Sequence, residues 1–124
     1  MPPHQSPLEF VTTLAEPTRL RILNCLAATP LFVSDLQAVL DLPQPTVSRH
    51  LRVLRTIGVV QDTPIAQFVL YRLRREENAR GRLVRVILET MHADERLKTE
   101  RLRAVERSRA HSVERTRSPA PAMP

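Results

Sequence analysis

Apolar residues recur three or four positions apart through most of the first half of the chain, a spacing that places them on one face of a helix. Four such stretches predict helices, over residues 8–15, 18–28, 34–40 and 44–57. Ser34 and Gln37 match the S-x-x-Q capping box, so we expect the third helix to begin at Ser34. Asp41 follows this helix and tolerates the left-handed conformation of a tight turn. Gly58 is expected to end the fourth helix as a C-cap glycine.

Beyond Gly58 the periodicity shortens to that of β-strands. Val59–Gln61 and Phe68–Leu73 read as two strands, joined by a tip at Asp62–Ala66 that contains Pro64. The tip has no glycine to specify its turn type. The pattern therefore predicts a β-hairpin directly after the fourth helix.

A long helical pattern begins near Ala79. Its apolar stripe, with residues four positions apart, consists of Leu83, Ile87 and Met91. The stripe thins after Met91, where Arg and Glu dominate. We expect one helix that frays between residues 95 and 110.

The charge is strongly basic and uneven. The 124 residues carry a formal net charge of +6, with a sequence pI of about 11.1. Residues 1–71 hold five arginines and five acids, whereas residues 72–124 hold fourteen Lys and Arg against eight acids. This balance favours a polyanionic partner or plain solubility. Aromatic residues make up only 3%, which argues against a stacking platform for single-stranded nucleic acid.

Cysteine usage and hydropathy bear on the compartment. Cys25 is the single cysteine, so one chain has no intramolecular disulfide and no multi-thiolate metal site, and we expect a buried structural thiol. Residues 1–7 show no signal-peptide pattern, and no apolar run is long enough to span a membrane. We therefore expect a soluble cytoplasmic protein that has no membrane partner.

The stretch Gln44–Arg55, QPTVSRHLRVLR, combines an apolar face with a cationic one and contains no acid. At about 100° per residue, the inner face consists of Val47, Leu51 and Leu54. A short helix, a tight turn, this helix and a hairpin follow one another in the order of a winged helix-turn-helix, in which the hairpin is called the wing. Such a recognition helix fits the major groove of double-stranded DNA. The expected DNA contacts are Gln44, Thr46, Ser48, Arg49, His50, Arg52 and Arg55. His50 sits towards the buried side, so packing is its alternative role.

Three segments resemble the ArsR/SmtB family of bacterial winged-helix repressors. They are LAEPTRLRIL (14–23), DLPQPTVSRHLRVLRTIGVV (41–60) and LYRL (70–73), and the resemblance spans roughly residues 8–92. It implies a homodimer formed by the first and last helices, a palindromic operator, and repression relieved by an inducer. The residues expected in the dimer interface are Leu8, Val11, Leu83, Val84, Ile87, Leu88 and Met91. An unpaired apolar stripe on the last helix favours such an interface on physical grounds as well.

The expected fold class is mainly α (α+β). It is a winged helix-turn-helix of order α-α-α-α-β-β-α with a long C-terminal dimerisation helix. Residues 1–7 form a disordered lead, residues 8–95 the DNA-binding and dimerisation domain, and residues 96–124 a charged helical extension with a disordered Pro/Ser/Ala tail.

The chain departs from the family where many members bind metal. The start of the third helix, Leu31–Leu36, carries no sulfur in place of the usual Cys-x-Cys pair. The family's metal-binding positions on the last helix fall near Arg75, Glu77, Leu88 and Met91, of which only Glu77 can ligate. Spacing leaves open a site that joins Glu89, His92 and Glu95 of two chains. We expect no metal and no cofactor, and the inducer stays unidentified.

The sequence also bears on three other classes of function. A winged-helix module that binds protein is the first alternative, favoured mildly by a wing tip with one acid and no cation. A nonspecific architectural DNA binder is the second. The arginines of this chain after residue 95 are interleaved with Glu, so we interpret that region as a solvated helix. We therefore expect Arg107→Ala to leave DNA affinity almost unchanged. An enzyme is not expected, because the two glycines form no phosphate loop and no catalytic motif is present.

Overall fold

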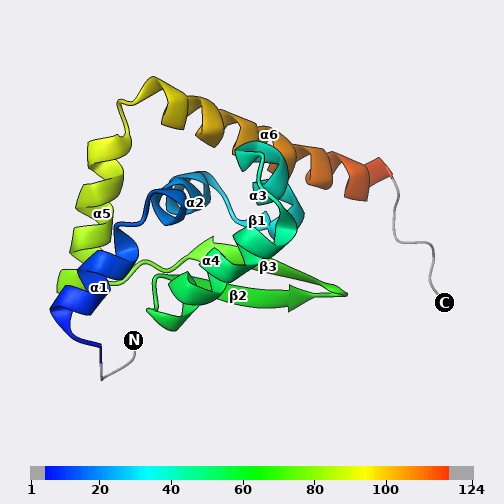
Figure 1. The fold of residues 1–124 in the computed structure, drawn as a ribbon. Helices are drawn as coiled ribbons and strands as arrows, with labels where there is room; N and C mark the ends of the chain where they lie inside the picture. Colours follow the sequence, from blue (N-terminus) through cyan, green and yellow to red (C-terminus); the bar gives the residue numbers. More distant parts are fainter. Residues whose placement is uncertain (1–4, 118–124) are drawn as a thin grey trace.

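The computed structural model describes residues 5–117, and side-chain surroundings for residues 5–111. Within that range the elements in chain order are α1 Pro7–Leu14, α2 Pro17–Ala28, β1 Leu31–Phe32, α3 Val33–Leu40, α4 Gln44–Thr56, β2 Val60–Ile65, β3 Phe68–Leu73, α5 Ala79–Met91 and α6 Glu95–Arg117. The strands form a small antiparallel sheet, whose β2–β3 hairpin lies at the lower edge of the molecule in Figure 1, with α5 on the left and α6 along the top. The mainly α winged helix-turn-helix class is confirmed, although β1 and a separate α6 were not in the predicted order.

The first two helices form where the sequence predicts them, within a residue or two. The Ser6 hydroxyl accepts a hydrogen bond from the Glu9 N–H and caps α1. The Glu16 carboxylate accepts from the Arg19 N–H and caps α2, whose first residue is Pro17. Both caps satisfy N–H groups that the helix itself leaves without acceptors.

The predicted capping box of α3 is wrong. The helix begins at Val33, and Ser34 is an exposed residue inside its first turn. The side chain that caps it is Asp35, whose Oδ2 accepts from the Phe32 N–H at 2.9 Å. Apolar Phe32 therefore takes the N-cap position, because the carboxylate three residues later supplies the acceptor.

The turn into α4 and the end of α4 follow the predictions. Asp41 has φ 55° and is left-handed, and Gly58 beyond the helix has φ 82°. Pro43 is the N-cap of α4 and provides no side-chain acceptor, because a proline side chain has no oxygen. The first turn of α4 is thus uncapped by any side chain.

The hairpin is longer and tighter than predicted. β2 continues through Pro64 to Ile65, and only Ala66 and Gln67 separate it from β3. Ala66 has φ 55°, the left-handed backbone that such a two-residue turn requires. The strand order is β1-β3-β2, so β2 is an edge strand. Pro64, which has no N–H to donate, is tolerated there because one side of an edge strand has no neighbouring strand to bond.

The C-terminal third differs most from the prediction. A long C-terminal helix is present, but the helical pattern breaks after Met91 and α6 starts afresh at Glu95. α6 turns back across α2 and α3, along the top of Figure 1, and does not fray before residue 110. Ala104 has 0% exposure, the lowest value among the apolar side chains of α6 that the structure describes. Residues 118–124 of the expected tail lie outside the described residues.

The core consists of Leu, Ile and Val side chains from every layer. The least accessible side chains include Ile22, Leu31, Leu36 and Leu51. Phe10 of α1 is buried in the same cluster. None of the helices in the described range is long and apolar enough to cross a membrane.

Candidate nucleic-acid interface

α4 is anchored by its apolar face. Val47, Leu51 and Leu54 each have 0% exposure, as the helical spacing predicted. Burying three such side chains contributes about 1.5–3 kcal/mol each to folding. The outer face of α4 is therefore held in a defined orientation.

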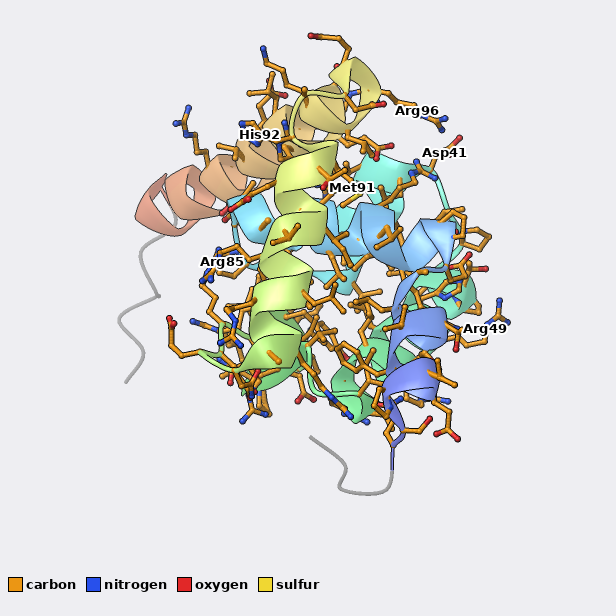
Figure 2. All side chains as sticks on the ribbon, turned by 90° about the vertical axis from the view of Figure 1, so that its left-hand side faces the viewer. Asp41, Arg49, Arg85, Met91, His92 and Arg96 are labelled. Carbon is orange, nitrogen blue, oxygen red and sulfur yellow. The ribbon has the colours of Figure 1, made fainter. Side chains whose placement is uncertain are left out.

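Two arginines on that outer face are free. Arg49 and Arg52 are exposed, and neither guanidinium has a hydrogen-bond or ion-pair partner among the residues that the structure describes. Figure 2 shows Arg49 projecting from α4 away from the body of the protein. Free guanidinium groups on a rigid helix are available for bidentate contacts with phosphate or guanine.

The N-terminal end of α4 carries short polar groups. The Gln44 amide donates to the Ser48 hydroxyl at 2.7 Å, and Thr46 is half-buried beside them. This hydrogen bond orients both side chains on the exposed surface. The N-terminal part of a recognition helix is the part that usually meets base edges.

Arg55 is engaged rather than free. Its Nη1 lies 2.9 Å from Oδ2 of Asp62, so the guanidinium of α4 pairs with the one acid of the hairpin. Both side chains are partly exposed, which limits such a pair to about 0–1 kcal/mol. The pair neutralises the acid that the sequence placed near the wing tip.

His50 packs inward, which is the alternative role that its position on the helix predicted. Its Nδ1 accepts from Nε of Arg19 at 3.2 Å and lies 3.7 Å from the Glu16 carboxylate, with 12% of the side chain exposed. Burial lowers the pKa of His50, the charges of Arg19 and Arg49 lower it further, and Glu16 opposes the change. The ring joins α4 to the start of α2.

The wing presents apolar side chains. Ile65 and Phe68 are 41% and 56% exposed on either side of the two-residue turn. From Gln61 to Tyr71 the chain holds no Lys or Arg. The outer part of the wing, from Gln61 to Tyr71, therefore has no cationic side chain of its own to attract phosphate.

α1 and α5 lie side by side and expose apolar groups. Arg80 of α5 donates to the Gln5 carbonyl at 2.8 Å and lies 4.7 Å from the Phe10 ring centre, which joins the two helices. Leu8 is 79% exposed and Val11 is 45% exposed.

The predicted stripe on α5 is less exposed than expected. Val84 is 6% exposed and belongs to the chain's own core, so a partner chain could reach little of it. Leu83, Ile87, Leu88 and Met91 are half-buried. Val86, at 55% exposure, was missed because it falls outside the four-residue spacing. The interface itself stays a prediction.

A cavity of about 510 Å³ separates α5 from the end of β3 and the C-terminal part of α2. Ala27, Leu73 and Leu88 line it together with charged groups that include Arg85 and Glu89. Across the described part of the chain, no three His, Cys, Asp or Glu side chains come close enough to hold a metal ion. Glu89 and His92 are both exposed, so a site shared by two chains stays untested.

Cys25 is inaccessible, as expected for a structural thiol. It has 0% exposure beneath α6, and burial raises the pKa of its thiol to about 12. The thiolate is the reactive form, so Cys25 is inert at neutral pH while the protein is folded.

Comparison with known proteins places this geometry among bacterial regulators. A family profile described as "Bacterial regulatory protein, arsR family" matches residues 16–62. The biofilm growth-associated repressor of Agrobacterium fabrum is 43% identical over 71 residues, which cover 57% of this chain and 61% of that protein. The HTH-type transcriptional regulator Rv2034 of Mycobacterium tuberculosis is 38% identical over 73 residues, covering 59% of this chain and 68% of that one.

Solved structures agree with the sequence comparison. The transcriptional repressor BigR from Xylella fastidiosa superimposes with a TM-score of 0.61 at 30% identity, over 71% of this chain and 85% of that one. HlyU from Vibrio cholerae superimposes with a TM-score of 0.56 at 34% identity, over 66% of this chain and 83% of HlyU. The chain spans 52–62% of the length of the first curated relatives that it matches. By name the two relatives and BigR are repressors or transcriptional regulators, and none of the three is named as an enzyme.

Proposed function

The chain belongs to the ArsR family of bacterial regulatory proteins, and from this premise we propose that it is a dimeric repressor that binds a palindromic operator in double-stranded DNA. The observation that carries the proposal is the outer face of α4. Arg49 and Arg52 are free there, while the opposite face of the same helix is fully buried.

DNA recognition follows from this arrangement. α4 enters the major groove, where an arginine pairs with guanine or with phosphate. Gln44, Thr46 and Ser48 lie near the N-terminus of the helix, in reach of base edges or backbone. His50 takes no part in readout; it sets the angle of α4 against α2 through Arg19.

Dimerisation places two recognition helices on one duplex. Leu8, Val11 and Val86 expose apolar area on adjacent helices, which a second copy would remove from water. A twofold axis at this surface gives each α4 one half-site of a palindrome. The apolar wing tip contributes little electrostatic affinity, so α4 supplies most of the DNA contacts.

The start of α3 lacks the ligands by which many family members bind thiophilic metals, so the proposal names no inducer. The start of α3 offers Asp35 instead of cysteines, and that carboxylate is occupied by side chains of α6. No resident cofactor is proposed. The site of action is the cytoplasm, where the operator is.

The test is fluorescence anisotropy of the purified protein on its own upstream DNA and on a scrambled duplex. Both are measured near physiological salt and across a salt series, because an affinity without its salt concentration cannot be interpreted. A preference of roughly a thousandfold or more for the upstream DNA supports the proposed repressor.

Two results would contradict it. Equal and steeply salt-dependent binding to both duplexes would indicate a nonspecific architectural protein. No binding to either would point to a protein partner, for which the exposed Ile65 and Phe68 of the wing are the natural surface.

A further inference from the structure

α6 docks on α2 and α3 through polar groups more than apolar ones. Glu100 is 5% exposed and pairs with Arg21, whose guanidinium donates to both carboxylate oxygens. The Asn24 amide donates to the Leu97 carbonyl, and its oxygen accepts from Arg101 at 2.7 Å. Such bonds require a particular position of α6, because hydrogen bonds depend on direction and apolar contacts do not.

The C-terminal end of this interface converges on one carboxylate. Asp35, at the start of α3, has 0% exposure. Its Oδ1 accepts from Nε of Arg107 at 3.1 Å and lies 2.7 Å from Nε2 of His111. Its Oδ2 caps α3 through the Phe32 N–H. Two side chains of α6 thus meet the group that begins the helix-turn-helix.

His111 also reaches the sheet. Its ring lies edge-on to Phe32 of β1, with centroids 5.6 Å apart at 81°. Phe32 lies edge-on to Phe68 of β3, at 6.0 Å and 68°. Phe32 pairs with Leu70 in the ladder, so Phe68 is its diagonal neighbour. One row of rings therefore runs from α6 through β1 to the wing.

We propose that His111 is a positioning residue, and that the end of α6 is a clasp that holds α3 and the wing in the arrangement that reads DNA. The carboxylate contact acts on α3 and the ring contact acts on β3. Figure 1 shows α6 crossing over α3 and extending past it, with α4 and the hairpin below. The clasp acts on DNA recognition without touching DNA, and in this respect it rests on the proposed function.

The three-stranded sheet explains why a clasp is needed. β1 has only two residues, and the β2–β3 hairpin extends beyond it with Ile65 and Phe68 exposed. A two-stranded hairpin on its own is marginally stable. The ring of Phe32, backed by His111, contacts Phe68, the first residue of β3 after the turn.

Three variants at His111 separate its two contacts. His111→Ala removes both. His111→Phe keeps a ring against Phe32 and removes the donor to Asp35, whereas His111→Gln keeps a donor and removes the ring. Arg109→Ala is the matched control, because Arg109 is exposed on the same helix and has no interaction in the described residues.

The first readout is amide hydrogen exchange in the free, full-length protein. We expect His111→Ala to speed exchange in residues 68–71 of β3 and at the start of α3, with Arg109→Ala unchanged. Compared with His111→Ala, His111→Phe should restore slow exchange in β3, because the ring is kept. His111→Gln should restore slow exchange at the start of α3, because the donor to Asp35 is kept. Unchanged exchange in β3 for His111→Ala, or an equal increase for Arg109→Ala, would overturn the clasp.

The second readout is affinity for DNA. We expect His111→Ala to lose about tenfold on the specific duplex, equivalent to about 1.4 kcal/mol, and nothing on scrambled DNA. An equal loss on both duplexes would make His111 a phosphate contact and overturn the positioning role. If the native protein shows no preference for its upstream DNA, the proposed function fails, and hydrogen exchange alone still decides whether the clasp exists.

Discussion

α4 and α6 both carry several arginines, yet the two helices are anchored to the rest of the protein in different ways. α4 is held by three inaccessible apolar side chains and leaves Arg49 and Arg52 free. α6 is held largely by polar pairs, and its Arg101 and Arg107 are engaged with Asn24 and Asp35. A count of cations therefore says little about a nucleic-acid surface. What matters is which face of the helix its anchoring leaves outward, and whether unpaired guanidinium groups stand on that face, as Arg49 and Arg52 do on α4.

The largest difference between the two helices should appear in stability. Leu51→Ala on α4 removes a fully buried side chain and should cost about 2–5 kcal/mol of unfolding free energy. Leu102→Ala on α6 changes a side chain that is 56% exposed and should stay within about 0.5 kcal/mol. Chemical denaturation measures both. Similar losses would show that α6 buries Leu102 against another surface in solution.

Arg49→Ala should cost about 1–3 kcal/mol of binding free energy on the specific duplex and relax base choice at one position. The reason is that, in the proposed function, the free guanidinium of Arg49 on the outer face of α4 reads a base. Anisotropy titrations on the specific and scrambled duplexes measure it. Arg96→Ala, which changes an exposed arginine of α6, is the control. An equal loss on both duplexes would reassign Arg49 to phosphate.

Arg21→Ala should cost about 1–3 kcal/mol of unfolding free energy, because Glu100 is left as a buried carboxylate without its main partner. The hydrogen bond to Glu100 raises the pKa of Arg21, consistent with a close pair. Thermal unfolding of this variant and of Arg96→Ala provides the comparison. No difference between them would show that the polar anchoring of α6 adds nothing to stability.

The packing of His50 predicts a pH dependence. Its folded-state pKa is lowered, so the unfolded chain takes up the proton more readily. The contribution of His50 is fully present above its unfolded pKa and is lost as the pH falls through the folded value. His50→Gln keeps an acceptor for Arg19 and should flatten the fall in thermal stability between about pH 7 and pH 5. A slope identical to that of the native protein would mean that His50 does not contribute.

The smallest effect is expected for Arg107→Ala. Its side chain is 41% exposed, and His111 still contacts the same oxygen of Asp35 when Arg107 is removed. A partly exposed ion pair contributes about 0–1 kcal/mol. DNA affinity should be almost unchanged in anisotropy titrations. A large loss on both duplexes would place α6 on the DNA surface and remove the contrast with α4.

The candidate site was largely predictable because its local signals agree with one another. The helical spacing of Val47, Leu51 and Leu54 both buries one face and fixes which side chains point outward. His50 is the exception: its position on the helix allowed either role, and only the approach of Glu16 and Arg19 from α2 decided that it packs. Pairing of Arg55 with Asp62 was equally hidden, because the two residues meet only when the hairpin folds back beside α4.

The sequence by itself determined the helix-turn-helix, the hairpin after it and the left-handed turn at Asp41, because each depends on periodicity or on local backbone preference. Only the tertiary structure decided where the C-terminal arginines go. α6 has no apolar stripe to reveal its docking, and its partners Arg21, Asn24 and Asp35 lie more than seventy positions earlier in the chain. Polar docking leaves no periodic pattern in the sequence, because each bond depends on the geometry of one distant partner and not on a repeating apolar face.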